Sequence, residues 1–358
     1  MIVYLITILL SIFIARHAET KAGVDRAIWL LIAFFPLVLI AGLRASSVGV
    51  DTDYYPLPFF SYSLEMNLPD MMATAGCEPG FSSLIWILSR LTRSFNSVLL
   101  IVQLLMVLPI VWISHKLRVR HLQVVVLTYA CLIFPWSLNL MRQALACSTL
   151  IFAYYYAQNR NLVRYALCVL LSASIHNTGF LGLVFYPICL IARMEDGKRE
   201  RMALGFIVMA TAITVMVVAF PDLIVKPILH LKESYARFES DLYSGSFNAA
   251  LTSFPIAVSA CGFLLSRRNE SSKNDSWIFS LSLIMAFAGV LAPLSILNQT
   301  LSRLSEMYLI FSCFAIPGIV QIDRRAGLLL TAFSVAIFFW VYCYGNASGA
   351  LPYYFFWE

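Results

Sequence analysis

Long apolar runs separated by short polar breaks constrain this chain more than any other feature of its sequence. An apolar helix of about 20 residues is long enough to cross the roughly 30 Å hydrocarbon core of a bilayer. Hydrophobic residues make up 60% of the 358 positions and charged residues only 12%, about half the charged fraction of a soluble domain. The pattern therefore predicts an all-α polytopic membrane protein and excludes a secreted domain, a disordered chain and a cytosolic enzyme.

The runs predict about twelve transmembrane helices in a single integral-membrane domain, residues 1–358. The stretch 163–192 would be about 45 Å long as one helix at 1.5 Å per residue, which is too long for one crossing. It is interrupted at His176, so it is predicted to form two short helices. The expected crossings are 2–15, 27–43, 96–114, 122–138, 141–157, 163–175, 178–192, 203–220, 249–266, 277–294, 304–320 and 326–345.

The charges of the loops give an orientation. Most of the 25 Lys and Arg residues fall in one set of alternate loops, and an excess of basic residues marks the cytoplasmic side. Both termini are then expected outside, and the net charge of +6 does not indicate nucleic-acid binding. The basic cluster follows the first apolar run rather than preceding it, which is the reverse of a cleavable signal peptide.

Three segments fall outside the expected crossings. Residues 44–78 and 221–248 are predicted as external loops, and long loops in a tight membrane protein are usually functional. Residues 79–92 are predicted as an interfacial or re-entrant half-helix, because a full crossing there would place a basic loop outside. Within 221–248, Arg237 belongs to a stretch that is interpreted either as an interfacial helix attracting anionic groups or as a solvated loop.

His176 is the strongest single candidate for a functional residue on the predicted outer face. The helices on either side are too short to span the membrane alone, so their shared turn should lie below the outer surface. A titratable group at that depth is a functional-site candidate, and imidazole suits proton transfer near neutral pH. The alternative is that His176 merely caps the helix hairpin by hydrogen bonding.

Arginines supply the second set of candidates. Arg142 begins an apolar helix with no acidic residue near it in the sequence, so it is predicted to bind an anion such as phosphate, which a guanidinium matches well. Arg44 and Arg303 are candidates for the same anion. The alternative for these two arginines is an ion pair with one of four carboxylates, Asp51, Asp53, Glu78 or Glu306.

The carboxylates allow several interpretations. Asp51, Asp53 and Glu78 could coordinate a divalent metal, but contacts with sugar hydroxyls or with the arginines are favoured over metal binding. Tyr55 could stack on a sugar ring, although tyrosines are common at membrane interfaces.

Seven of the eight cysteines lie in apolar runs, and no zinc-ligand spacing occurs. No metal site, cofactor or disulfide framework is therefore predicted.

Several short motifs follow one another along the chain, ending with Arg303 and Tyr308. The earlier ones are Gly42-Leu-Arg44, Gly49-x-Asp51-Thr-x-x-Tyr55, Glu78-x-Gly80, Asn139-x-x-Arg142-Gln-x-x-Ala146 and His176. Their order and spacing resemble the EpsG family of bacterial exopolysaccharide polymerases, which are Wzy-like relatives of the O-antigen polymerases. The late Arg303 and Tyr308 look like the Arg–Tyr element of the family, and the resemblance runs from about residue 30 to 355.

The resemblance implies a glycosyltransferase of the integral-membrane GT-C type in the bacterial inner membrane. Its substrates would be oligosaccharide repeat units on undecaprenyl pyrophosphate, joined on the outer face without nucleotide sugar or metal. Membrane lipids, a chain-length regulator and a flippase are candidate partners, and nucleic acid is not.

Residue roles can be assigned on this basis. Arg142, with Arg44 and Arg303, would stabilise the pyrophosphate leaving group. His176 is the preferred general base, with Asp51 or Glu78 second. The residues expected to position sugars or bind substrate are Asp53, Tyr55, Glu78, Arg237 and Tyr308.

Other functions remain open at this point. An O-antigen ligase-like enzyme would use the same donor but move the glycan to another acceptor. A transporter or flippase of lipid-linked sugars would place polar residues near the bilayer midplane and often shows internal repeats. Here the ionisable residues gather on one side and no repeat is visible. A membrane acyltransferase could also use an embedded histidine, but the arginines would be unexplained.

Overall fold

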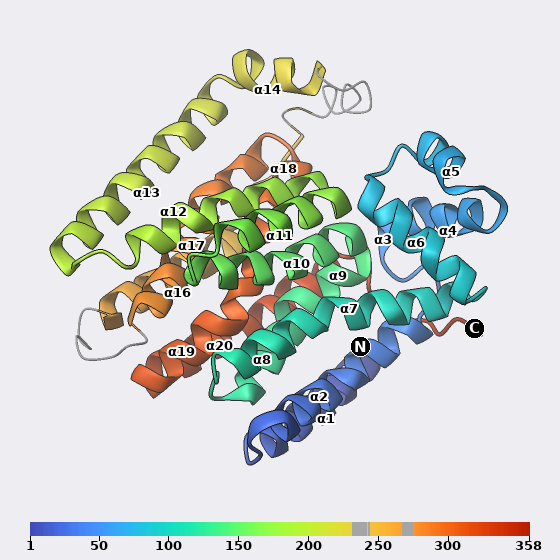
Figure 1. Cartoon of the computed structure of the whole chain (residues 1–358), viewed down its shortest axis with the longest axis horizontal. Coiled ribbons are helices and arrows are strands. Elements are labelled where there is room, and N and C mark those ends of the chain that lie inside the picture. The colour runs from blue at the N-terminus through green and yellow to red at the C-terminus, as the bar shows by residue number, and fades with distance from the viewer. Residues whose placement is uncertain (231–241, 243, 267–274) are drawn as a thin grey trace. The chain divides into compact units, whose positions relative to one another are not determined.

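The computed structural model describes residues 1–230, 242, 244–266 and 275–358. Within these ranges the chain is helical (Figure 1). The only extended pairing among the described residues is an isolated bridge between Arg44 and Phe355. The sequence prediction of an all-α membrane protein is confirmed in this respect. Arg237 and most of the second predicted external loop lie outside the described residues.

Each predicted crossing is mainly helical where the structure describes it. Four of the predicted crossings correspond to shorter or less apolar helices. One is the 18-residue helix Met141–Gln158, and the other three are apolar helices of 10–17 residues, namely Ile2–Ala18, Leu162–Ile175 and Asn177–Ile191. Among the described residues, eight helices are long and apolar enough to cross a membrane, which supports a multi-pass membrane protein, while the count of twelve stays a prediction. The eight are Gly23–Leu43, Phe95–Lys116, Leu122–Asn139, Asp196–Ala219, Ala249–Ser266, Ser276–Ile296, Gln299–Ile322 and Arg324–Tyr344.

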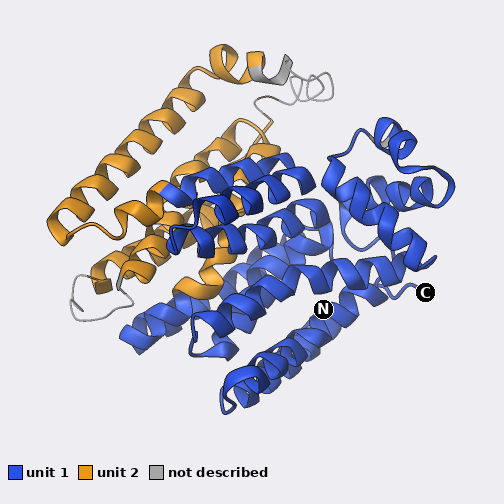
Figure 2. Ribbon diagram, viewed as in Figure 1, with its two compact units in different colours: residues 1–186, 316–358 blue, residues 187–315 orange. Residues whose placement is uncertain are grey.

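The chain divides into two compact units (Figure 2). Unit 1 comprises Met1–Tyr186 and Ile316–Glu358, and unit 2 comprises Pro187–Ala315. In unit 1, α1 (Ile2–Ala18) packs on α2 (Gly23–Leu43), α2 packs on α7 (Phe95–Lys116), and α7 packs on α10 (Met141–Gln158). The partner of α10 on its other side is α11 (Leu162–Ile175).

Segment 44–78, expected as a loop, instead forms three short helices, which are followed by a fourth. They are α3 (Val50–Tyr54), α4 (Pro56–Glu65), α5 (Leu68–Ala75) and α6 (Pro79–Leu91). Prolines lie in the first turn of α4, α5 and α6, where the missing N–H costs no helical hydrogen bond. The 13-residue α6 packs against α4, α5 and α11. Its predicted re-entrant placement in the membrane stays a prediction.

The C-terminal segment of unit 1 lies along the end of α2 and the residues after it. The backbone N–H groups of Ala45 and Phe356 donate to the carbonyls of Tyr354 and Leu43, each at 2.9 Å. The Tyr353 hydroxyl donates to the Ile40 carbonyl at 2.7 Å. These contacts fix the backbone immediately before α3.

In unit 2, the neighbours α16 (Ala249–Ser266) and α17 (Asp275–Leu291) pack together, and α13 (Asp196–Ala219) also contacts α17. The helix α14 (Pro221–His230) follows α13, and α18 (Gln299–Glu306) packs on α17. The Ser305 hydroxyl, on α18, donates to the Ala288 carbonyl of α17 at 2.7 Å.

Candidate functional site

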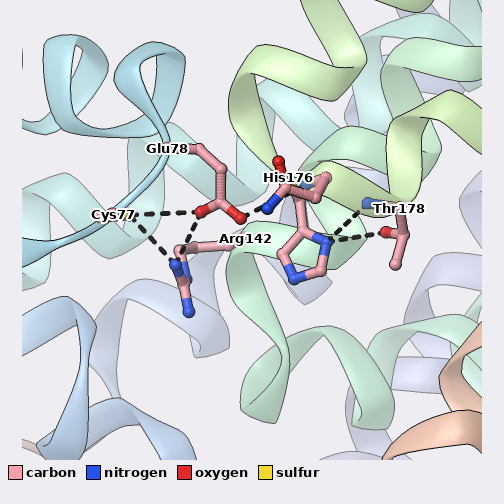
Figure 3. Close-up of polar contacts among 6 residues, drawn as sticks. Cys77, Glu78, Arg142, His176 and Thr178 are labelled. Atoms are coloured by element: carbon pink, nitrogen blue, oxygen red, sulfur yellow. Dashed lines mark hydrogen bonds and ion pairs between the residues drawn. The ribbon is translucent and has the colours of Figure 1, made fainter. Parts of the chain in front are cut away.

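An ion pair between Glu78 and Arg142 forms the centre of the candidate site (Figure 3). Glu78 is the residue before α6, and Arg142 lies in the first turn of α10. Arg142 Nη1 lies 2.9 Å from Glu78 Oε2, and the two side chains are 22% and 12% exposed. The sequence offered no nearby acidic residue for Arg142, because its partner is 64 positions away.

The Arg142 guanidinium is further held by aromatic rings and by a thiol. Its central carbon lies 5.2 Å from the ring centre of Tyr55 and 5.6 Å from that of Phe59, distances typical of cation–π contacts. Arg142 Nη1 also donates to Cys77 Sγ at 3.1 Å. A guanidinium restrained on several sides is preorganised, so it presents its charge in a fixed direction.

His176 ends α11 and begins the 3₁₀ helix Asn177–Val184 (η2), so the predicted break in the helix is confirmed. Its Nδ1 accepts from the Thr178 backbone N–H at 3.3 Å and lies 2.7 Å from the Thr178 hydroxyl. An Nδ1 that accepts a hydrogen bond has no proton, so the neutral imidazole carries its proton on Nε2. The capping role considered for His176 is therefore present in the structure.

The backbone beside His176 also reaches the ion pair. The Asn177 N–H donates to Glu78 Oε1 at 3.4 Å, while Arg142 binds the other carboxylate oxygen. Glu78 thus lies between Arg142 and His176 (Figure 3). The structure brings together three of the predicted catalytic residues from α6, α10 and α11.

Burial and charge act in opposite directions on the Glu78 carboxyl. Burial alone would raise its pKa. The positive charge of Arg142 lowers it, and His176 and hydrogen bonds from the backbone add to this effect. The net pKa of Glu78 is below the usual value of a glutamate. Burial raises the pKa of the adjacent Cys77 thiol, although Arg142 opposes this shift. At neutral pH the site therefore contains an ionised carboxylate and a neutral thiol.

Gly80 allows α6 to approach α11 at this site. A Cβ atom on Gly80 would lie 2.7 Å from the carbonyl oxygen of Ser174 and 2.8 Å from its carbonyl carbon, both backbone atoms of α11. These distances are well below the 3.4 Å at which ordinary contact begins. Glu78 reaches Asn177 because residue 80 has no side chain.

Asp51 lies in α3, which is fixed to the end of the helix Phe134–Asn139 (α9). The Asp51 backbone N–H donates to Asn139 Oδ1 at 2.7 Å. Gly49 before it has φ +92°, and a Cβ there would lie 2.8 Å from the Leu138 carbonyl carbon. Asp53, in the same short helix, is exposed. The structure therefore orients the α3 backbone by glycine and asparagine, two elements of the motifs seen in the sequence.

Arg44 is bound by backbone carbonyls rather than by a carboxylate. The side chain is buried, with only 2% of the residue exposed, and Nη1 donates to the carbonyls of Val48 (3.0 Å) and Leu138. The Asn96 amide in turn donates to the Arg44 carbonyl at 2.8 Å. Arg44 joins the end of α2 to the residues before α3 and to the end of the helix Phe134–Asn139 (α9).

Two other predicted substrate-binding residues lie in unit 2. Arg303 is in the last turn of α18, and Tyr308 follows that helix. Tyr308 is fully buried, and its ring packs edge-on against Phe287 with 5.4 Å between the ring centres. The structure places Tyr308 in the core of unit 2.

The sequence analysis did not select Phe59, Cys77, Thr178 or Asn139 as site residues. Cys77 had a signal, since it alone among the cysteines lies in a polar segment. The contacts of Phe59 and Thr178 depend on how α4 and η2 pack, which no local pattern in the sequence indicates. Among the residues that the structure describes, no group of three or more His, Cys, Asp or Glu side chains is arranged to hold a metal ion.

Comparison with known proteins identifies the family of this chain. The chain is 27% identical over 203 residues to the amylovoran biosynthesis protein AmsC of Erwinia amylovora, covering 56% of this chain and 52% of that protein. The chain thus aligns with about half the length of this curated relative. No solved structure matches. The sequence model of the EpsG family matches residues 27–355, and this chain therefore belongs to the EpsG family.

Proposed function

We propose that this protein is a polysaccharide polymerase that joins oligosaccharide repeat units carried on a lipid pyrophosphate. The proposal includes undecaprenyl as the lipid, the outer face of the bacterial inner membrane as the location, and a GT-C-type architecture with about twelve crossings and external termini. Family membership supports the class of reaction, and the name of AmsC associates a relative with amylovoran biosynthesis.

The observation that carries the proposal is the partly buried Glu78–Arg142 pair. The Glu78 carboxylate is a resting counter-ion that stabilises the preorganised guanidinium at low solvent exposure. An incoming pyrophosphate carries more negative charge than one carboxylate and can engage the guanidinium bidentately. We expect it to displace Glu78 from Arg142, which leaves the carboxylate free to accept a proton.

The chemistry then follows from these positions. An acceptor hydroxyl oxygen attacks the anomeric carbon of the donor sugar, and the bond from that carbon to the phosphate oxygen breaks. The bonding electrons leave with the lipid pyrophosphate, whose growing charge Arg142 stabilises. The hydroxyl proton passes to a base, for which the geometry favours Glu78 over His176, because Nδ1 of His176 is engaged by Thr178. His176 would donate Nε2–H to a substrate oxygen.

The remaining candidates have supporting roles in this scheme. Tyr55 lies against Arg142, so it fixes the guanidinium in addition to any contact with sugar. Asp51 and Asp53 are proposed to contact sugar hydroxyls. Arg44, bound to backbone carbonyls, is proposed to position the α3 segment rather than to bind pyrophosphate. Roles for Arg303, Tyr308 and Arg237 in substrate binding stay predictions from the sequence.

Complementation of a host lacking its own copy of the gene tests the proposal. The host would express Arg142→Gln, Arg142→Lys or Glu78→Gln. The length of the glycan would be determined by gel, and the amount of protein by immunoblot. Arg118→Gln is the matched control, since Arg118 is exposed and far from these residues in sequence. We expect the control to make a normal ladder and the Arg142 variants to accumulate single lipid-linked units at normal protein level. Normal polymer length in Arg142→Gln would refute the role of Arg142.

A further inference from the structure

A second cationic site lies at the opposite end of α6 from Glu78. A surface cavity of about 310 Å³ opens where this helix ends. Thirteen helical residues separate the two ends, about 20 Å at 1.5 Å per residue. The cavity is therefore distinct from the Glu78–Arg142 pair. It is lined by Leu64, Ser89, Arg90, Leu91, Thr92 and Arg93.

Two guanidinium groups line this cavity, and no carboxylate does. Arg90 is restrained, with Nη2 donating to the Met66 carbonyl at 3.1 Å and its central carbon 4.8 Å from the centre of the Trp86 ring. No ion pair involves Arg90 or Arg93 in the described part of the chain. Glu65 is adjacent in sequence to Leu64 but does not line the cavity. The cavity is positively charged and lacks an internal counter-ion.

Apolar side chains also lie at the rim of the same cavity, beside its polar wall. Leu91 is 75% exposed and Leu64 is also exposed, and both line the cavity. One turn before Leu91, Ile87 is 51% exposed. The opposite face of α6 is buried through Phe81, Ile85 and Leu88, so the exposed leucine and isoleucine are not part of the protein core. The cavity thus combines two cations with unpartnered apolar side chains.

We propose that this cavity binds the phosphate headgroup of an anionic phospholipid, with the acyl chains lying over Leu64, Ile87 and Leu91. Arg90 and Arg93 would bind the phosphate oxygens. The Thr92 hydroxyl at the same wall accepts from the Ser94 N–H at 3.2 Å and would donate its own proton to the phosphate. A phospholipid is favoured over a soluble phosphate because only a lipid matches both the charge and the apolar rim. Trp86 beneath Arg90 is the aromatic residue expected at the boundary between headgroups and acyl chains.

Native mass spectrometry of the full-length protein in detergent tests this inference. The probes are phosphatidylglycerol and the zwitterionic phosphatidylcholine with the same acyl chains. The site variant is Arg90→Gln combined with Arg93→Gln, and the control combines Arg118→Gln with Arg120→Gln, which removes the same charge from two exposed arginines outside the cavity. Because each substitution in the site removes a charge-assisted hydrogen bond to phosphate, the site variant should retain phosphatidylglycerol about tenfold less strongly, or weaker still.

Three results support the inference together: wild type prefers phosphatidylglycerol, the site variant loses this preference, and the control keeps it. Equal retention in all variants, or an equal decrease in the control, overturns it. Arg93→Gln alone should also weaken retention, and it keeps the contacts of Arg90 to Met66 and Trp86 if the double variant does not fold.

The source of the phosphate is tested with a third variant, Leu91→Gln. This change should reduce retention of phosphatidylglycerol while leaving any competition by glycerol phosphate unchanged. If Leu91→Gln has no effect and glycerol phosphate competes fully, the cavity binds a soluble phosphate and the phospholipid assignment is wrong. Preferential retention of undecaprenyl pyrophosphate through Arg90 and Arg93 would also overturn it and would identify a donor site.

Discussion

Replacing Gly80 with alanine separates close helix packing from side-chain chemistry at the candidate site. The new Cβ would lie 2.7 Å from the Ser174 carbonyl oxygen, whereas ordinary contact begins at 3.4 Å. The start of α6 or the end of α11 must therefore shift by about 0.7 Å, since neither atom belongs to a flexible side chain. Glu78 is two residues from the clash and moves with it.

The expected magnitude follows from this shift. The Asn177 N–H to Glu78 Oε1 contact is already 3.4 Å long, so a further 0.7 Å breaks it. Overpacking of this kind costs about 1–3 kcal/mol of stability, and a displacement of about 1 Å at a catalytic group can cost on the order of 10²-fold in rate. We therefore expect polymer synthesis to fall by about 10- to 100-fold without loss of the membrane-inserted protein.

The assay is the glycan ladder, normalised to protein level. Gly205→Ala in α13 is the control, because a Cβ there has no atom within 4 Å and alanine is a better helix former than glycine. Adding Ser174→Ala to Gly80→Ala should not restore activity, because the conflict at 2.7 and 2.8 Å is with backbone atoms. Full activity of Gly80→Ala, or its rescue by Ser174→Ala, would refute the packing argument.

Three further predictions concern the charge and chemistry around this centre. Because the pKa of Glu78 is below its usual value, the stabilisation by its ionised form is complete above about pH 4.3 and is lost as pH falls through the lowered pKa. Thermal melting between pH 6 and pH 3 should show a smaller acid destabilisation in Glu78→Gln than in wild type, and equal destabilisation would contradict the pairing. N-ethylmaleimide should inactivate wild type but not Cys77→Ser, and because burial raises the pKa of Cys77 the inactivation rate should still increase above pH 8.5. A plateau below that pH would contradict the raised pKa. Arg44→Met should lower the free energy of unfolding by about 1–3 kcal/mol, since it removes the guanidinium donor from two buried carbonyls and leaves them only the longer contacts with the single Thr52 hydroxyl. An unchanged melting temperature would contradict this role.

The helices were predictable because membrane-spanning segments carry a strong local signal. Apolar runs of the required length located them, and the break at His176 followed from the excess length of 163–192. Segment 44–78 was predicted as a loop because its helices have 5, 10 and 8 residues, too few for a clear periodic pattern. Prolines mark the starts of α4 and α5, which a length criterion for membrane spans does not detect.

The site was predictable in its residue types but not in its pairings. Arg142 and Glu78 were selected separately, and their contact depends on the approach of α6 to α10 and α11. Arg44 was expected to meet an anion or a carboxylate, whereas the structure satisfies it with carbonyls of Val48 and Leu138. Backbone acceptors have no sequence signature, so this solution is visible only in three dimensions. Tyr55 was assigned to sugar binding, which stays a prediction, and the contact of its ring with Arg142 was not foreseen.

Turnover by the purified protein in nanodiscs tests the central claim most directly. The substrate is the lipid-linked repeat unit of the native host, with EDTA present and nucleotide sugar absent, and products are resolved by gel. The account predicts a ladder from wild type and from Arg118→Gln, and none from Arg142→Gln or Glu78→Gln. A ladder from Arg142→Gln, or transfer of the glycan only to a different lipid or protein acceptor, would contradict it.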